Sequence, residues 1–191
     1  MKIGIAFCGS FCTTSEVIEI CEKLILDGYQ ITPILSEHVN SIDTRFGKSD
    51  DIVKKITQIC KNKPILDIVS AERIGPEKMF DALVIAPCTG NTLAKLAQGI
   101  TDNTVTMSAK SHLRNERPLI IALASNDALS AGAVNLGTLL NRKHYYFVPL
   151  GQDNPFEKPN SLVCDMNLIS KTIEQAVLKK QIQPILSTFV K

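Results

Sequence analysis

Short apolar runs alternate with longer amphipathic stretches along this chain. Near-continuous apolar runs are typical of strands that are buried on both faces of a sheet. We therefore predict five strands, each followed by a more polar segment. They span residues 2–7, 30–35, 81–86, 118–124 and 145–150.

The stretches between these strands carry helical periodicity. After the first strand, apolar residues recur at positions 17, 18, 20, 21, 24 and 25, and Gly28 follows as a stop signal. Ser49 or Asp50 is expected to cap the second helix. The predicted helices span residues 15–26, 50–60, 91–98, 104–113, 127–142 and 167–180.

Strands that alternate with helices predict a parallel sheet covered on both faces. We expect one α/β domain over residues 1–191, with a three-layer, doubly wound parallel sheet of the flavodoxin-like or Rossmann-like type. The C-terminal loop 151–166 and the helix 167–180 would close this domain. Ligands of such folds bind outside the carboxyl ends of the strands.

Composition narrows the class of protein. The chain has 191 residues, 45% of them hydrophobic, and a net charge of +2, which is too small to indicate nucleic-acid binding. No apolar run is long enough to span a membrane, and the N-terminus begins as a strand instead of a signal peptide. We expect a cytoplasmic protein with reduced cysteines. Without a C-x-x-C pair or zinc-type histidine spacing, we expect no metal.

Two polar loops follow the first two strands. Gly9 and Ser10 stand before a helix N-terminus, where free N–H groups and the helix dipole suit a phosphate. The alternative is an ordinary capped helix start, since G-x-G-x-x-G is absent. In the second loop, Ser36 ends a strand, His38 is a candidate acid or base, and Arg45 could bind a carboxylate. The alternative for Arg45 is a solvated surface side chain.

A third loop follows the strand at 81–86. Pro87 is expected to stop that strand, and Gly90 to leave room for a ligand. Hydroxyl, amide and carboxylate groups then cluster at two helix starts, where they are candidates for cofactor binding. These residues are Thr89, Asn91, Thr92, Asp102 and Asn103. After the next strand, Ser125 and Asn126 extend the set, although Asn126 could instead cap a helix.

The third loop carries the motif of a known family. Ala86-Pro87, Thr89 and Asn91-Thr92 match A-P-x-S/T-x-N-S/T, and Gly99–Asn103 matches G-I/L-x-D-N. This segment resembles the flavoprotein decarboxylase family, and Gly9-Ser10 resembles the flavin-phosphate turn of that family. The resemblance implies a flavodoxin-like sheet that binds FMN between subunits, commonly in trimers or multiples of them.

Further segments resemble one branch of this family, the B subunits of dipicolinate synthases. They are "DTRFG" (43–47), "RNERP" (114–118), "SNDALS" (125–130) and "GQDNPFEKPNS" (151–161). The branch implies oxidation of a dihydrodipicolinate-type precursor to pyridine-2,6-dicarboxylate, in the mother cell of a sporulating bacterium. The partner would be the A subunit of dipicolinate synthase. Because this chain has no nicotinamide fingerprint, NAD(P) would bind to that partner.

The chain departs from the decarboxylases at one important position. Where they carry a catalytic histidine, the alignment places Arg73. An arginine stays protonated and is no general base, but it can bind a carboxylate bidentately. We therefore expect Arg73 and His38 as catalytic residues, and Arg45, Arg73 and Asn91 as substrate-binding residues. A stand-alone FMN-dependent decarboxylase and a flavin-less binding or scaffold subunit remain open alternatives.

Overall fold

The central sheet holds seven strands in a computed structural model of the chain, which describes residues 1–187. The order is β2-β1-β3-β4-β7-β6, and β5 also pairs with β4. The strands are β1 Lys2–Phe7, β2 Gln30–Leu35, β3 Ala82–Cys88, β4 Leu119–Ser125, β5 Tyr145–Phe147, β6 Leu150–Gly151 and β7 Leu162–Cys164. Strands β1 to β5 run parallel, so all their carboxyl ends meet at one edge.

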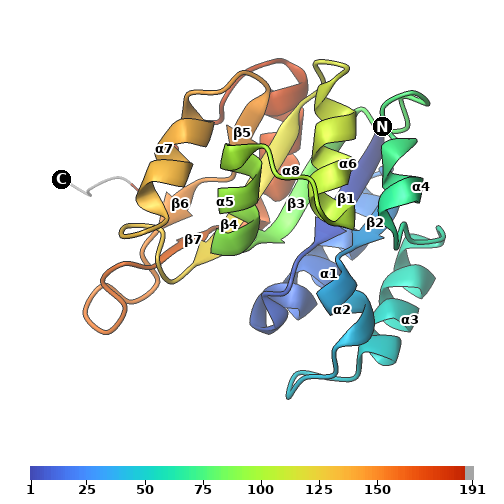
Figure 1. Ribbon diagram of the computed structural model, residues 1–191, viewed down its shortest axis with the longest axis horizontal. Coiled ribbons are helices and arrows are strands. Elements are labelled where there is room, and N and C mark those ends of the chain that lie inside the picture. Colours follow the sequence, from blue (N-terminus) through green and yellow to red (C-terminus); the bar gives the residue numbers. More distant parts are fainter. Residues whose placement is uncertain (188–191) are drawn as a thin grey trace.

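Helices cover both faces of this sheet, as predicted. In Figure 1, α5 and α6 lie in front of the sheet and α8 lies behind it. Helix α6 packs against α4 and α5, α5 packs against α7, and α1 packs against α3 and β3. The helices are α1 Phe11–Leu26, α2 Glu37–Ser41, α3 Ser49–Cys60, α4 Ile68–Glu72, α5 Gly90–Gln98, α6 Thr104–Leu113, α7 Ala133–Leu140, the 3-10 turn η1 Met166–Leu168, and α8 Ile169–Val177.

The core consists of the three central strands and the apolar faces of the helices. All seven residues of β3 are buried, and β4 is buried except for Ala124. Burial on both faces explains why these strands are continuous apolar runs in the sequence. Among residues 1–187, no helix is long and apolar enough to cross a bilayer.

The structure corrects several predictions around the strands. Pro87 does not stop its strand, because β3 continues through a cis Ala86-Pro87 bond to Cys88. The predicted last strand, 145–150, is divided between β5 and β6, and the predicted loop 151–166 contains β7. Since β7 is antiparallel to both β4 and β6, the sheet is mixed and not wholly parallel.

Several predicted helix boundaries were also wrong. The helix predicted at 167–180 is the 3-10 turn η1 followed by α8, which ends at Val177. Helix α1 begins at Phe11, four residues earlier than predicted. Neither Ser49 nor Asp50 caps α3, because the helix starts at Ser49, whose hydroxyl donates to Asp43 at 3.1 Å. The helix predicted from residue 127 begins only at Ala133, so Asn126 caps no helix there.

Candidate functional site

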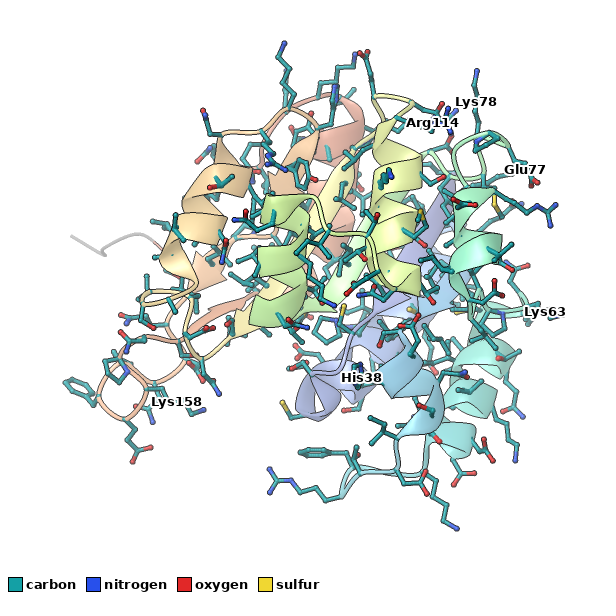
Figure 2. All side chains as sticks on the ribbon, in the orientation of Figure 1. His38, Lys63, Glu77, Lys78, Arg114 and Lys158 are labelled. Atoms are coloured by element: carbon teal, nitrogen blue, oxygen red, sulfur yellow. The ribbon has the colours of Figure 1, made fainter. Side chains whose placement is uncertain are left out.

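A pocket of about 520 Å³ opens at the carboxyl edge of the parallel strands. Segments that follow β1, β2 and β3 line it, as expected for this class of sheet. Figure 2 labels His38 at this edge of the molecule. The lining residues are Cys8, Gly9, Ser36, Glu37, His38, Thr89, Asn91, Thr92, Lys95, Asp102, Asn103 and Val105.

The segment after β3 is held by a short chain of hydroxyl contacts. Thr89 caps α5, since its Oγ1 accepts from the Thr92 N–H at 3.2 Å and lies 3.1 Å from Thr92 Oγ1. The Thr92 hydroxyl in turn contacts Cys8 Sγ at 3.3 Å. This contact joins the first and third segments of the pocket wall. Thr92 therefore supports the wall as well as lining it.

The two thiols of this region are packing groups. Burial raises the pKa of Cys8 to about 11, although the hydrogen bond from Thr92 opposes the shift. Burial also raises the pKa of Cys88 well above its usual value. Both thiols are therefore protonated at neutral pH and are poor nucleophiles.

Gly90 serves the fold, contrary to our expectation that it leaves room for a ligand. A Cβ at this position would lie 2.6 Å from Ser125 Oγ and 2.7 Å from Asp127 Oδ1. The chain itself therefore fills this space. The Ser125 hydroxyl donates to Asp127 Oδ1, which holds the segment after β4 beneath the start of α5. Neither Ser125 nor Asn126 lines the pocket.

The segment after β2 is tied to the start of α6. Ser36 caps α2 by accepting from the Val39 N–H at 3.4 Å. Glu37 Oε1 accepts from the Thr104 N–H at 2.9 Å and from the Thr104 hydroxyl at 2.8 Å. These contacts place His38, which is exposed, at the pocket rim.

The charges of the pocket wall are mostly paired. Lys95 Nζ lies 2.8 Å and 2.9 Å from the two carboxylate oxygens of Asp102. This hydrogen bonding lowers the pKa of Asp102 below its usual value, so the pair persists at neutral pH. With Glu37, the wall carries two carboxylates and one ammonium group.

Two residues of the pocket wall, Glu37 and Lys95, were not predicted from the sequence. Lys95 had a usable signal, because it lies four residues after Asn91 and so shares its helix face. Glu37 had none, because its partner Thr104 is 67 residues away.

Two further predicted cofactor residues, Ser10 and Pro87, lie beside the pocket without lining it. Ser10 is the residue before α1, and its Oγ accepts from the Thr13 hydroxyl at 3.1 Å. It adjoins Gly9, which is exposed at the rim. Pro87 is buried within β3 and acts on the pocket only through the course of the backbone.

The two predicted substrate arginines lie apart from the pocket of this chain. Arg45 stacks over the Phe46 ring at 4.9 Å, in the loop beyond α2. Arg73 is paired with Glu77 at 2.7 Å, and its side chain is 70% exposed. Figure 2 labels Glu77 at the opposite end of the molecule from His38. The reason is that α4 packs against the C-terminal half of α6, where Ser111 donates to Glu72 O.

The three histidines have different surroundings. His38 is exposed and His144 half-buried. His112, near the end of α6, is 1% exposed. Burial lowers the pKa of His112 to about 4, so its ring is neutral at neutral pH. Within residues 1–187, no cluster of three His, Cys, Asp or Glu side chains could hold a metal ion.

Comparison with known proteins assigns the family. The flavoprotein family model matches residues 1–182. The chain is 43% identical to the dipicolinate synthase B subunit of Bacillus subtilis, over 97% of this chain and 92% of that protein. The chain belongs to the flavoprotein family, in the branch of the dipicolinate synthase B subunits.

Solved flavoprotein structures agree with this assignment. The crystal structure of the dipicolinate synthase B subunit from Bacillus halodurans matches with a TM-score of 0.89 and 41% identity, covering 98% of this chain and 96% of that chain. The FMN-dependent cysteine decarboxylase SpaF matches with a TM-score of 0.67 and 24% identity, covering 92% and 97% respectively. The second match shows a shared fold. The predicted Rossmann-like flavoprotein architecture is therefore confirmed.

Proposed function

We propose that this chain is the flavin-binding B subunit of a dipicolinate synthase. With the A subunit of that enzyme, it would oxidise a dihydrodipicolinate-type precursor to pyridine-2,6-dicarboxylate in the mother-cell cytoplasm of a sporulating bacterium. The similarity to two dipicolinate synthase B subunits supports the assignment. The observation that carries it is the pocket, where segments after three parallel strands converge at the ligand edge of the sheet.

The residues of this pocket fit FMN. Its volume of about 520 Å³ lies within the usual range for cofactor sites. Gly9 and Ser10 stand at the N-terminus of α1, where backbone N–H groups favour a phosphate. The polar side chains of Ser36, Thr89, Asn91, Thr92, Asp102 and Asn103 would bind the remaining polar groups. FMN, when bound, supplies two-electron redox chemistry.

The reaction requires an electron acceptor and a path for protons. Forming the aromatic ring from a dihydropyridine removes two hydrogens, so an oxidant must accept them. We propose that NAD(P) on the A subunit serves as the final acceptor, since this chain lacks a nicotinamide fingerprint. His38 at the rim would accept a proton. We also propose a homo-oligomer, trimeric or a multiple of a trimer, as the working form.

A dicarboxylate substrate needs cationic partners. Lys95 is engaged by Asp102, and Arg73 is paired at the far end of the chain. Among the predicted arginines, Arg45 has no carboxylate within ion-pair distance in residues 1–187. We therefore propose Asn91, which lines the pocket, and Arg45, which lies outside it in the loop beyond α2, as substrate-binding residues, and we no longer include Arg73.

The test is a flavin titration of the purified full-length chain, followed by its absorption spectrum and FMN fluorescence. Asn91→Asp places a carboxylate in the pocket and should weaken FMN binding about tenfold, since one lost hydrogen bond and a like charge act together. Asn126→Asp is the matched control, because Asn126 is an exposed amide outside the pocket. Equal binding by both variants would refute the placement of the site.

Activity measurements separate the alternatives. The proposed function predicts pyridine-2,6-dicarboxylate only when the A subunit is added. Carbon dioxide release from a carboxylated thiol by this chain alone would identify a stand-alone decarboxylase. A colourless chain that does not bind added FMN, but that the A subunit needs in order to form pyridine-2,6-dicarboxylate, would identify a scaffold subunit.

A further inference from the structure

The rim of the pocket is made of short segments that are distant in sequence. Each segment caps its own helix, as Thr89 does for α5 and Asn103 does for α6. Such local caps do not hold one segment against another. Among the side-chain hydrogen bonds of residues 1–187, the contact between Glu37 and Thr104 is the one that joins the segment after β2 to the start of α6.

This contact has the features of a strong hydrogen bond pair. One carboxylate oxygen accepts both the N–H and the hydroxyl of Thr104, at 2.9 Å and 2.8 Å. Thr104 is fully buried and is the first residue of α6, where the backbone N–H has no partner within the helix. Hydrogen bonds to a charged acceptor at a helix N-terminus are stronger than neutral ones.

Helix capping alone does not account for Glu37. Asn103 already caps α6, because its Oδ1 accepts from the Thr106 N–H at 2.9 Å. Helix α2 has only five residues, and an isolated helix of that length has little stability of its own. The contact therefore mainly stabilises α2, and the start of this helix places Ser36 and His38 at the pocket.

We propose that Glu37 is a positioning residue for flavin binding. It fixes α2 against the start of α6, and so sets the distance between His38 and the segment that carries Asn91 and Asn103. The inference rests on the proposed flavin function and adds a residue that the sequence motifs do not contain. It predicts that removing the acceptor oxygen of Glu37 weakens FMN binding more than removing its charge alone.

The experiment measures the dissociation constant for FMN with the full-length chain. Glu37→Ala should raise it about tenfold, since both hydrogen bonds to a charged acceptor are lost. Glu37→Gln keeps an acceptor oxygen and should stay within about threefold of the wild type. Thr104→Val should cause an intermediate loss, and it should add little in the Glu37→Ala background. Glu19→Ala, at an exposed glutamate on α1, is the control.

A second readout separates positioning from general stability. The imidazole resonance of His38 in the NMR spectrum should shift on FMN addition in the wild type and in Glu37→Gln. In Glu37→Ala it should lose this shift. A chain that binds FMN but tolerates Glu37→Ala overturns the inference, and so does a Glu37→Gln variant that binds as weakly as Glu37→Ala.

Failure of the proposed function has a different signature. In that case the wild type itself would not bind FMN. The coupling between Glu37 and Thr104 would then be read from the free energies of unfolding of the two single variants and the double variant. A coupling near zero would overturn the positioning role of Glu37 even without flavin.

Discussion

His112 makes the stability of this protein depend on pH in a defined window. Its ring is buried in α6, and Nε2 donates to the Pro118 carbonyl at 3.0 Å. Burial lowers its pKa from 6.5 to about 4, and the nearby Arg117 adds to the effect. The Pro118 carbonyl and Asp81 act in the opposite direction without cancelling it.

The sign and size of the effect follow from linkage. The unfolded chain takes up the His112 proton near pH 6.5, whereas the folded chain does so only near pH 4. The stability that the folded chain has while His112 is neutral is therefore fully present above pH 6.5. It is lost as the pH falls from 6.5 to 4. At about 1.4 kcal/mol per pH unit, the full difference is about 3 kcal/mol. Between pH 7.5 and 4.5 we expect a loss of about 2.5 kcal/mol.

Urea unfolding at several pH values between 7.5 and 4.5 tests this prediction. His112→Gln keeps an N–H donor but cannot titrate, so its free energy of unfolding should fall by about 2.5 kcal/mol less than that of the wild type. Gln181→Ala, which removes no titratable group, is the control. Hydrogen bonds hold the pKa of Asp43, Asp67 and Asp102 below 3.8, so these carboxyls act mainly below the window.

Parallel pH curves for the wild type and His112→Gln would refute the reasoning. An NMR titration of the wild type gives an independent answer that needs no substitution. The His112 ring should remain neutral at pH 5.5, where an exposed histidine is largely protonated. A His112 ring that titrates near pH 6.5 would refute the assigned burial effect.

Three further substitutions should change thermal stability. Gly90→Ala should destabilise the chain by about 1–3 kcal/mol, because its Cβ would overlap Ser125 Oγ and force a shift. Gly137→Ala, within α7 and with no heavy atom within 4 Å of the new Cβ, should stabilise it by up to about 1 kcal/mol. Gln181→Ala should cost about 1–2 kcal/mol, because the Gln181 amide pairs with both the N–H and the carbonyl of Phe147. Thermal unfolding checks all three, and a stabilised Gly90→Ala or an unaffected Gln181→Ala would contradict the packing described.

The spacing of apolar residues was sufficient to predict several of the strands and helices. The runs at 2–7 and 30–35 coincide with β1 and β2, and 104–113 coincides with α6. The same spacing wrongly predicted a helix between residues 127 and 132, where the Asp127 carbonyl accepts from the N–H groups of Ser130 and Gly132. These turns have the same apolar spacing as a helix, so the pattern could not distinguish them.

The residues of the candidate site were likewise predicted only in part. The small polar residues after β1, β2 and β3 were predicted to share one edge, because parallel strands place their carboxyl ends together. Gly9, Ser36 and most of the polar residues after β3 do line one pocket, whereas Ser10 lies beside it. The two arginines were assigned by alignment and charge alone. Nothing in the sequence around either arginine indicates where its side chain lies relative to the sheet. Neither arginine lines the pocket.

The sequence by itself determined a layered α/β fold and the edge at which a ligand would bind, because burial and strand direction are local patterns. Only the tertiary structure decided which polar groups face the pocket. Glu37 meets Thr104 across 67 residues, and Gly90 meets Ser125 across another crossover of the sheet. Such contacts depend on the packing of whole elements, and no local spacing of residues encodes them.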